Sequence, residues 1–265
     1  MADAPWDDER PIVVPPLPEG AVQVWLARLA DAAPDAALVH ADAVLSDEER
    51  ARAVRAAASR RREFVAGRRL LRRVLGAQLG TAPRAVPIVL DPTGKPRLAP
   101  IAPGTAADAL RFSLAHAGDV LLVAVSRAGD VGVDVERIDP TRDHAAITAR
   151  YFASEEQVAL AATPEAQRVE AFTRCWTRKE AMVKAIGTGI AGGLTTFVVP
   201  VTVAPMVRLV RAPDGWDAPG PPGAMDGVGS GRGWVLRDLE VPPGYLASLA
   251  LRGADTPVSV FRVAP

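Results

Sequence analysis

The 265 residues, of which 49% are hydrophobic and 5% aromatic, are enough to bury one large core or two ordinary ones, which excludes an intrinsically disordered protein. The 31 basic and 31 acidic residues balance, so no overall positive charge attracts nucleic acid. A single cysteine, Cys175, excludes an intrachain disulfide and a cysteine-based metal cluster. Since no apolar run is long enough to cross a bilayer and the acidic start does not resemble a signal peptide, we expect a cytoplasmic protein.

Positive charge gathers in the first third of the chain and is carried almost entirely by arginine. Ten arginines and four acidic residues lie between Ser46 and Arg73, so an anionic ligand could bind there, although a solvated, salt-bridged face would have the same composition. Only three lysines, Lys95, Lys179 and Lys184, stand against 28 arginines. Because lysine can donate a proton and arginine essentially cannot, these three positions are candidates for chemistry.

The first half of the chain is predicted to mix strands and helices. In chain order we expect a strand at residues 21–26, helices at 46–59 and 60–79, a turn at 91–96, and strands at 110–117 and 120–126. Ser46 and Glu49 form a capping box for the first helix, and Gly80 ends the second. The second helix has one apolar stripe, so its arginines are expected on the opposite face.

The next predicted strand carries two carboxylates. Residues 131–137 read V-G-V-D-V-E-R, and because side chains alternate along a strand, Asp134 and Glu136 project from the same face. Two adjacent like charges cost free energy unless a cation, a proton or solvent compensates them. An edge strand with a solvated polar face explains the pattern equally well.

Two further helices are predicted before a β-rich remainder. Ser154 and Gln157 are expected to cap the shorter one, and the longer one covers residues 164–186, with a proline at its first position and Gly187 at its end. The longer helix contains the stretch C-W-T-R-K-E-A-M-V-K at residues 175–184.

Within that stretch, Trp176, Glu180 and Lys184 are spaced four apart and share one helical face. Alone, this spacing is typical of a surface ion pair beside a buried tryptophan. Together with Asp134 and Glu136, however, Glu180 would complete a set of three hard oxygen ligands, which suits Mg²⁺ bound to a phosphate-bearing substrate.

Five motifs in register resemble the 4′-phosphopantetheinyl transferases of the surfactin-synthetase-activating type. They are G-V-D-V-E-R, W-T-R-K-E-A-M-V-K, T-G-K-P at residues 93–96, F-S-L-A-H-A-G at 112–118 and R-Y-F-A-S-E-E at 150–156. The resemblance covers residues 45 to 200. Ser113, Ala115 and Ala117 depart from the asparagine and serine that members commonly have around the histidine, so Ala115 receives no role.

The resemblance implies an α+β fold of two similar α/β halves, a pseudo-dimer with the active site in the cleft between them. Residues 1–128 would form the half with coenzyme A-binding basic helices. Residues 129–265 would form the half with the metal-binding and W-x-x-K-E-A motifs. The protein is expected to be a monomer.

The activity implied is that of a holo-acyl-carrier-protein synthase. Such an enzyme transfers 4′-phosphopantetheine from coenzyme A to a serine of an apo acyl or peptidyl carrier protein, with Mg²⁺ as cofactor, and releases adenosine 3′,5′-bisphosphate. The resemblance implies neither nucleic acid nor a membrane as partner, and it leaves the pathway open among fatty-acid, polyketide and nonribosomal peptide synthesis.

Residue roles transfer by motif position. The metal ligands would be Asp134, Glu136 and Glu180, and the catalytic residues would be Glu156, Lys184 and Glu180. Contacts to coenzyme A would come from Arg50, Lys95, His116, Lys179 and Lys184. Glu156 and a metal-bound hydroxide both stay open as the base for the serine.

Two other functions fit parts of the pattern. Acidic residues with a lysine and a basic helix also occur in magnesium-dependent nucleases, and residues 50–73 could belong to a nonenzymatic nucleic-acid-binding module. The helical reading of E-A-M-V-K disfavours the nuclease. Overall neutrality and the absence of interleaved aromatic residues disfavour the binding module.

Overall fold

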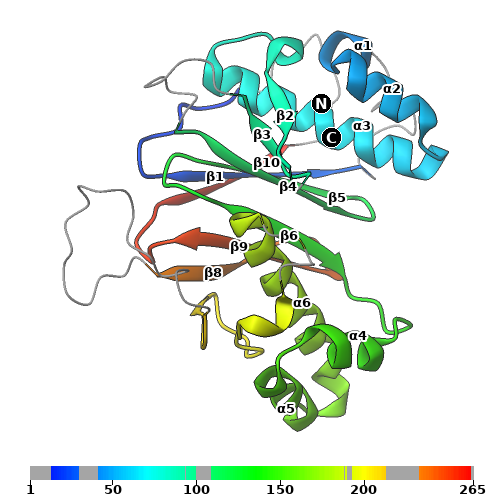
Figure 1. Cartoon of the computed structure of the whole chain (residues 1–265), viewed down its shortest axis with the longest axis vertical. Coiled ribbons are helices and arrows are strands. Elements are labelled where there is room, and N and C mark those ends of the chain that lie inside the picture. The colour runs from blue at the N-terminus through cyan, green and yellow to red at the C-terminus, as the bar shows by residue number, and fades with distance from the viewer. Residues whose placement is uncertain are drawn as a thin grey trace. The chain divides into compact units, whose positions relative to one another are not determined.

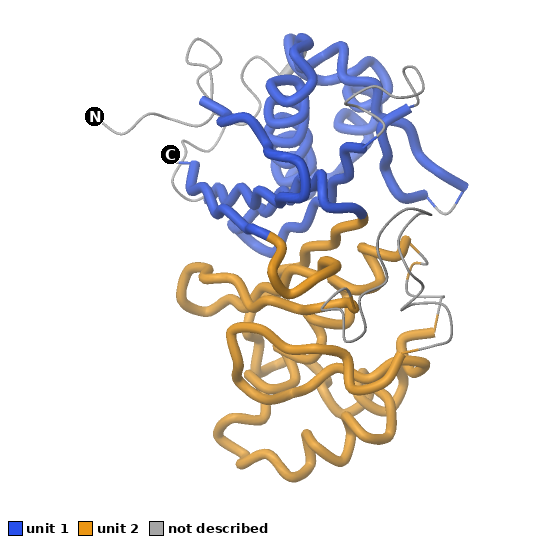
Figure 2. The backbone as a smooth tube through the Cα atoms, turned by 90° about the vertical axis from the view of Figure 1, so that its left-hand side faces the viewer, with its two compact units in different colours: residues 1–129, 257–265 blue, residues 130–256 orange. Residues whose placement is uncertain are grey.

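The computed structural model describes residues 13–29, 41–92, 94–99, 109–187, 189, 193–212 and 233–263. Contacts within the chain divide it into two compact units, residues 1–129 with 257–265 and residues 130–256 (Figure 2). Both units contain helices and strands, so the predicted mixture of α and β structure is confirmed. No helix in the described part of the chain has the length and apolar character that a membrane span needs.

The first unit is built on a four-stranded sheet in the order β10-β1-β5-β4 (Figure 1). β1 runs parallel to β10 and antiparallel to β5, and β4 is antiparallel to β5. β5 is buried along its whole length. The strands of this sheet and of a separate hairpin are β1 (Val22–Arg28), β4 (Arg111–Ala117), β5 (Val120–Ser126), β10 (Val258–Val263), β2 (Ile88–Leu90) and β3 (Pro96–Leu98).

The two units differ from the predicted halves, residues 1–128 and 129–265, in the unit to which β10 belongs. β10 pairs in parallel with β1, so residues 257–265 belong to the first unit. The ring of Phe261 on β10 stacks on Trp25 of β1 with 4.6 Å between centroids. A strand at the far end of the sequence can join either sheet, and only the tertiary structure decides which.

The first unit has the two predicted helices, but the first ends at Arg55 rather than at residue 59, the second begins at Ala58 rather than at residue 60, and the short helices before and after them were not predicted. The helices of this unit are α1 (Ala41–Val44), α2 (Asp47–Arg55), α3 (Ala58–Leu79) and the 3-10 helix η1 (Pro83–Ala85). The capping box is confirmed, since the Glu49 N–H donates to Ser46 Oγ at 3.3 Å and the Ser46 N–H donates to Glu49 Oε2 at 3.1 Å. Gly80 ends α3 in the left-handed conformation.

The expectation that the arginines of α3 lie opposite its apolar face is wrong for three of them. Arg68, Arg69 and Arg72 are buried. Arg72 Nε donates to a Glu49 carboxylate oxygen at 2.5 Å, and Arg72 Nη1 donates to the backbone carbonyls of the turn that follows α3, at Pro83, Arg84 and Val86. A guanidinium can be buried here because a carboxylate and backbone carbonyls satisfy its donors.

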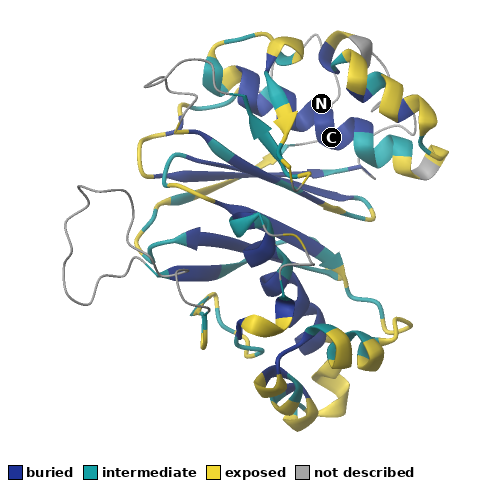
Figure 3. Cartoon of the chain, in the orientation of Figure 1, coloured by how far each residue is buried: buried dark blue, intermediate teal, exposed yellow. Residues whose placement is uncertain are grey.

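The second unit is an antiparallel sheet in the order β6-β9-β8-β7, packed against α6. Figure 3 shows buried residues in dark blue along both α6 and the sheet, whereas much of α5 is exposed. The rings of Phe152, Phe172 and Trp176 stack in the core. The elements are β6 (Gly132–Arg137), α4 (His144–Tyr151), α5 (Ser154–Ala162), α6 (Glu165–Ile186), η3 (Leu194–Thr196), β7 (Met206–Arg208), β8 (Trp234–Leu239) and β9 (Tyr245–Arg252).

The N-termini of α5 and α6 differ slightly from the prediction. Ser154 is the first residue of α5 rather than its cap, and the N–H of Ala153, the residue before it, donates to Glu156 Oε2 at 2.8 Å. Gln157 instead donates from Nε2 to the carbonyl of Phe152 at 3.0 Å. The predicted pairing of Ser154 with Gln157 is therefore wrong. α6 begins one residue later than predicted, and it ends at Gly187 as expected.

β6 and α6 approach each other closely at Gly132. A Cβ atom added to Gly132 would lie 1.9 Å from the Ala181 carbonyl oxygen and 2.4 Å from the Ala185 nitrogen. Both are backbone atoms of α6, so the only relief is movement of the helix away from the strand. Glycine at this position therefore sets the distance between the strand and the helix.

Replacing Gly132 with alanine should lower the free energy of unfolding by about 3 kcal/mol, because overpacking against a backbone cannot be relieved by a change of rotamer. Urea denaturation monitored by circular dichroism measures the change. Gly67→Ala is the matched control, since a Cβ on this α3 residue would meet Leu114 at an ordinary 3.5 Å and should be neutral or slightly stabilising. Equal stability of the Gly132 variant and the wild type would contradict the close approach.

Candidate active site

The polar face of β6 lies under α6 rather than in solvent. β6 is an edge strand, as one interpretation of its sequence expected, but Asp134 is only 5% exposed. Gly132, Asp134 and Glu136 alternate onto one face, and that face contacts α6 at Gly132. The fully solvated interpretation of the two carboxylates is therefore wrong for Asp134.

The helical face predicted from the spacing of Trp176, Glu180 and Lys184 is directed at these carboxylates. Lys184 Nζ lies 2.7 Å from Asp134 Oδ1, and Trp176 Nε1 donates to Glu136 Oε1 at 3.0 Å. Strand and helix thus bring together residues that are 40 and 50 positions apart in the sequence.

Two oxygens at this contact lack a hydrogen-bond partner although they are buried. They are Asp134 Oδ2 and Glu180 Oε1. Burial raises the pKa of Asp134 to about 6, with Lys184 opposing the shift and Glu136 adding to it. Burial, together with the charge of Asp134, raises the pKa of Glu180 to about 7, with Lys184 opposing the shift. The site therefore holds more negative charge than its protein partners compensate.

These oxygens fit a hard divalent cation in chemical type. Carboxylate oxygens are the donors that Mg²⁺ prefers, and a cation would supply the partner that Asp134 Oδ2 and Glu180 Oε1 lack. Among the described residues, however, no group of three or more acidic, histidine or cysteine side chains is arranged so that it could hold a metal ion. In this structure the ammonium of Lys184 takes one of the Asp134 oxygens instead.

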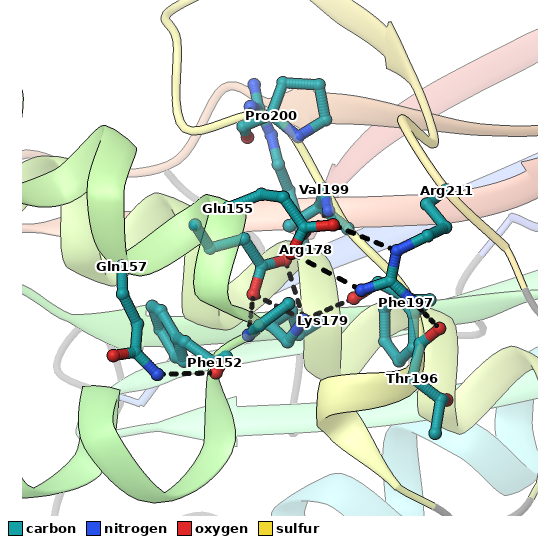
Figure 4. A network of polar contacts seen from close by, with 12 residues as sticks. Phe152, Glu155, Gln157, Arg178, Lys179, Thr196, Phe197, Val199, Pro200 and Arg211 are labelled. Atoms are coloured by element: carbon teal, nitrogen blue, oxygen red, sulfur yellow. Dashed lines mark hydrogen bonds and ion pairs between the residues drawn. The ribbon is translucent and has the colours of Figure 1, made fainter.

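Glu156 and Lys179 form a second polar cluster, which is completely buried. Lys179 Nζ lies 2.7 Å from both Glu156 oxygens and donates to the carbonyl of Phe197 at 3.0 Å. Glu156 Oε1 also accepts from the N–H of Val199 at 2.8 Å. Figure 4 shows Lys179 between Phe152 and Phe197, and its ammonium lies 4.3 Å from the centroid of the Phe197 ring.

This placement bears on the roles that the resemblance implies for the two residues. Both side chains are 0% exposed, and burial lowers the pKa of Lys179 although Glu156 opposes the shift. Neither a serine hydroxyl nor a phosphate reaches the pair unless it opens. As it stands, the pair joins α5, α6 and the segment after η3.

Three predicted phosphate contacts lie in the first unit. Arg50 pairs with Asp47 one turn earlier on α2. His116 is an exposed residue of β4 rather than part of the turn that follows, and its Nδ1 lies 3.8 Å from Glu63 Oε2. Lys95 is half-buried between β2 and β3. Thr93 of the same T-G-K-P motif lies outside the described residues.

Two arginines of the second unit were not singled out from the sequence. Arg142 Nη1 lies 3.4 Å from Glu136 Oε2, and no motif pointed to it. Arg178 is fully buried and uses all of its N–H groups: Nε and Nη2 bind the Asp238 carboxylate at 3.0 and 2.8 Å. The remaining donors bind the carbonyls of residues 200, 202 and 204. Its position inside W-T-R-K was the one available signal.

Comparison with known proteins identifies the family of this chain. Residues 130–217 match the family model of the 4′-phosphopantetheinyl transferase superfamily, a segment that contains both the β6 carboxylates and α6. The chain is 36% identical over 181 residues to the 4′-phosphopantetheinyl transferase HetI of Nostoc sp., an alignment that covers 68% of this chain and 75% of that relative.

Two further relatives carry the same description. The 4′-phosphopantetheinyl transferase psf-1 of Bacillus pumilus is 31% identical over 166 residues, which cover 60% of this chain and 67% of the relative. The 4′-phosphopantetheinyl transferase AcpT of Escherichia coli K12 is 35% identical over 128 residues, or 48% of this chain and 59% of the relative. On these matches, the chain belongs to the 4′-phosphopantetheinyl transferase superfamily and is a transferase.

Proposed function

We propose that this enzyme transfers the 4′-phosphopantetheine group of coenzyme A to a serine hydroxyl of an apo acyl or peptidyl carrier protein. Family membership supports the reaction type. The observation that carries the proposal is the pair of buried, unpartnered oxygens on Asp134 and Glu180, because a site for a diphosphate and its cation needs such donors. A cytoplasmic location and a monomeric state stay predictions from the sequence.

The reaction exchanges one phosphorus–oxygen bond for another. The serine oxygen forms a bond to the phosphorus that carries pantetheine, the bond from that phosphorus to the bridging oxygen breaks, and adenosine 3′,5′-bisphosphate leaves. Catalysis of such a transfer is mainly positioning and charge stabilisation. Asp134, Glu136 and Glu180 would hold Mg²⁺, which when bound neutralises charge on the diphosphate.

Lys184 is the proposed partner of the leaving phosphate. The Lys184 side chain is 31% exposed, although its ammonium contacts Asp134. The ammonium can therefore reach a bound ligand without first having to be released from the core. A lysine suits this role because it carries a compact charge on a flexible stem. In the first unit, Arg50, Lys95 and His116 are proposed to bind the other phosphates of coenzyme A. Lys179 is less suited to that role because its charge is buried against Glu156.

The serine proton needs an acceptor, and Glu156 is the side chain that the family resemblance offers for it. Both Glu156 oxygens already accept hydrogen bonds from Lys179 and from backbone N–H groups, so Glu156 can act as the base only if this pair opens. Glu180 is kept as a proposed ligand of Mg²⁺, and its raised pKa of about 7 describes the metal-free site.

Incubation with coenzyme A, Mg²⁺ and a panel of apo carrier proteins tests the proposed function directly. Mass spectrometry should show at least one carrier gaining one phosphopantetheine group, with adenosine 3′,5′-bisphosphate formed in equal amount. A chelator should stop the reaction. If every carrier stays unmodified while a DNA substrate is cleaved in the presence of Mg²⁺, the proposal is wrong and the nuclease alternative replaces it.

Replacing Asp134 with asparagine should lower kcat at least about a hundredfold, because it removes a charged ligand while keeping the shape of the side chain. Glu165→Gln is the matched control: this exposed residue in the first turn of α6 should tolerate the change. Turnover by the Asp134 variant that equals the wild type at the same Mg²⁺ concentration would rule out the role of Asp134 in holding the metal.

Glu180→Gln should make the metal-free protein more stable at pH 8. The pKa of Glu180 is raised in the folded state, so folding favours its protonated form, and that contribution is lost as the pH rises from about 4.5 to about 7. Glutamine does not ionise, so the variant does not lose this stability as the pH rises. Its Tm in the presence of a chelator should exceed that of the wild type by about 2 to 4 °C at pH 8.

The difference in Tm should become small at pH 4, which lies below the pKa of Glu180 in both the folded and the unfolded state. Added Mg²⁺ should raise the Tm of the wild type more than that of the variant, since a ligand stabilises the state that binds it. Differential scanning calorimetry at the two pH values, with Glu165→Gln as control, measures both effects. A variant less stable than the wild type at pH 8 would contradict the raised pKa.

A further inference from the structure

Arg142 is the cation next to the β6 carboxylates that neither the sequence motifs nor the proposed mechanism uses. Its Nη1 lies 3.4 Å from Glu136 Oε2, and its side chain is 39% exposed. The other Glu136 oxygen accepts from the Trp176 indole N–H. Both oxygens of Glu136 are therefore engaged by the protein, whereas Asp134 and Glu180 each keep one oxygen without a partner.

The loop that carries Arg142 is held by hydrogen bonds on both sides of it. Asp139 Oδ1 accepts from the Thr141 N–H at 2.9 Å and from the Thr141 hydroxyl at 2.6 Å. On the other side, Asp143 caps α4 by accepting from the Ala146 N–H at 3.0 Å. These local contacts hold the backbone between Ile138 and α4, so the loop places the start of the Arg142 side chain within reach of Glu136.

A cation that approaches the three carboxylates competes with Arg142 for Glu136. Once the cation displaces the guanidinium of Arg142 from Glu136, the guanidinium can bind another anion. Its planar, paired N–H donors match phosphate oxygens better than the ammonium of a lysine does. The diphosphate of coenzyme A would supply such oxygens, since Asp134, Glu136 and Glu180 are the residues proposed to hold its cation. Since the Arg142 side chain is partly exposed, it can turn from one partner to the other without crossing the core.

We propose that Arg142 is a coenzyme A-binding residue that rests on Glu136 until a divalent cation binds, and then moves to a phosphate oxygen of the coenzyme. This inference rests on the proposed function of the same site. In the resting state Arg142 compensates a carboxylate, and in the loaded state it compensates the diphosphate. Arg142 is therefore expected to lower the affinity for the metal and to raise the affinity for the coenzyme.

Because Arg142 is expected to change the affinities for Mg²⁺ and for coenzyme A in opposite directions, binding measurements without catalysis test the proposal. Mg²⁺ binding without coenzyme is followed by NMR, through the indole N–H resonance of Trp176, because this N–H donates to Glu136. The resonance is assigned by its disappearance in Trp176→Phe. Coenzyme A binding at saturating Mg²⁺, without a carrier protein, is measured by titration calorimetry. The variants are Arg142→Ala, Arg142→Lys and Arg137→Ala.

Arg137→Ala is the matched control. Arg137 is an exposed residue at the end of β6, and the alternation along the strand turns it away from the face of Asp134 and Glu136. It removes the same charge at nearly the same place without removing a contact to Glu136. Effects of general electrostatics should therefore be equal in Arg137→Ala and Arg142→Ala.

For Arg142→Ala we expect the Kd of Mg²⁺ to fall about threefold to tenfold and the Kd of coenzyme A to rise at least about tenfold, the size of a lost charge-assisted hydrogen bond. Arg142→Lys should keep the wild-type Mg²⁺ affinity within about twofold and lose most of the coenzyme A affinity, because lysine keeps the charge but not the fork. Arg137→Ala should change either constant by less than about twofold.

The possible failures can be told apart. If the wild type binds coenzyme A with Mg²⁺ and Arg142→Ala behaves like Arg137→Ala, this inference is wrong and the proposed function stands. The inference is also wrong if both constants of Arg142→Ala move in the same direction. If the wild type binds no coenzyme A under any Mg²⁺ concentration, the proposed function fails, and the role of Arg142 fails with it.

Discussion

The close packing of α6 on β6 is the constraint on which the candidate active site depends. Gly132 lets the two backbones approach, and the next residue on the same strand face, Asp134, is then almost completely shielded from solvent. Asp134 and Glu180 are desolvated as a result, and their raised pKa values express the cost. A site that binds a cation gains from such a cost, because the ion relieves it when it arrives.

Local signals in the sequence predicted much of the fold. The capping box at Ser46, the left-handed stop at Gly80 and the shared face of Asp134 and Glu136 each follow from a few neighbouring residues, and the structure has all three as expected. The i,i+4 spacing likewise predicted that Trp176 and Lys184 point the same way. Their contacts to the β6 carboxylates followed only when strand and helix were considered together.

What the sequence could not predict depends on distant parts of the chain. Arg69 and Lys179 look like surface residues until the tertiary structure buries them. In the case of Lys179, the partner is Glu156, 23 residues earlier. Arg142 belongs to no motif, and its contact with Glu136 follows only from the position of the loop that carries it. The family assignment adds to the helical position of Glu180 and Lys184 in disfavouring the nuclease, and to the overall neutrality in disfavouring a nucleic-acid-binding module.

The parallel pairing of β10 with β1 has a consequence for biosynthesis. Residues 130–256 complete their own sheet, whereas the sheet that begins with β1 lacks an edge strand until residues 258–263 have left the ribosome. The unit that is translated first is therefore the last to be finished, which reverses the usual order of domain folding during translation. Until then the open side of β1 is a strand edge that a chaperone, or another nascent chain, can occupy.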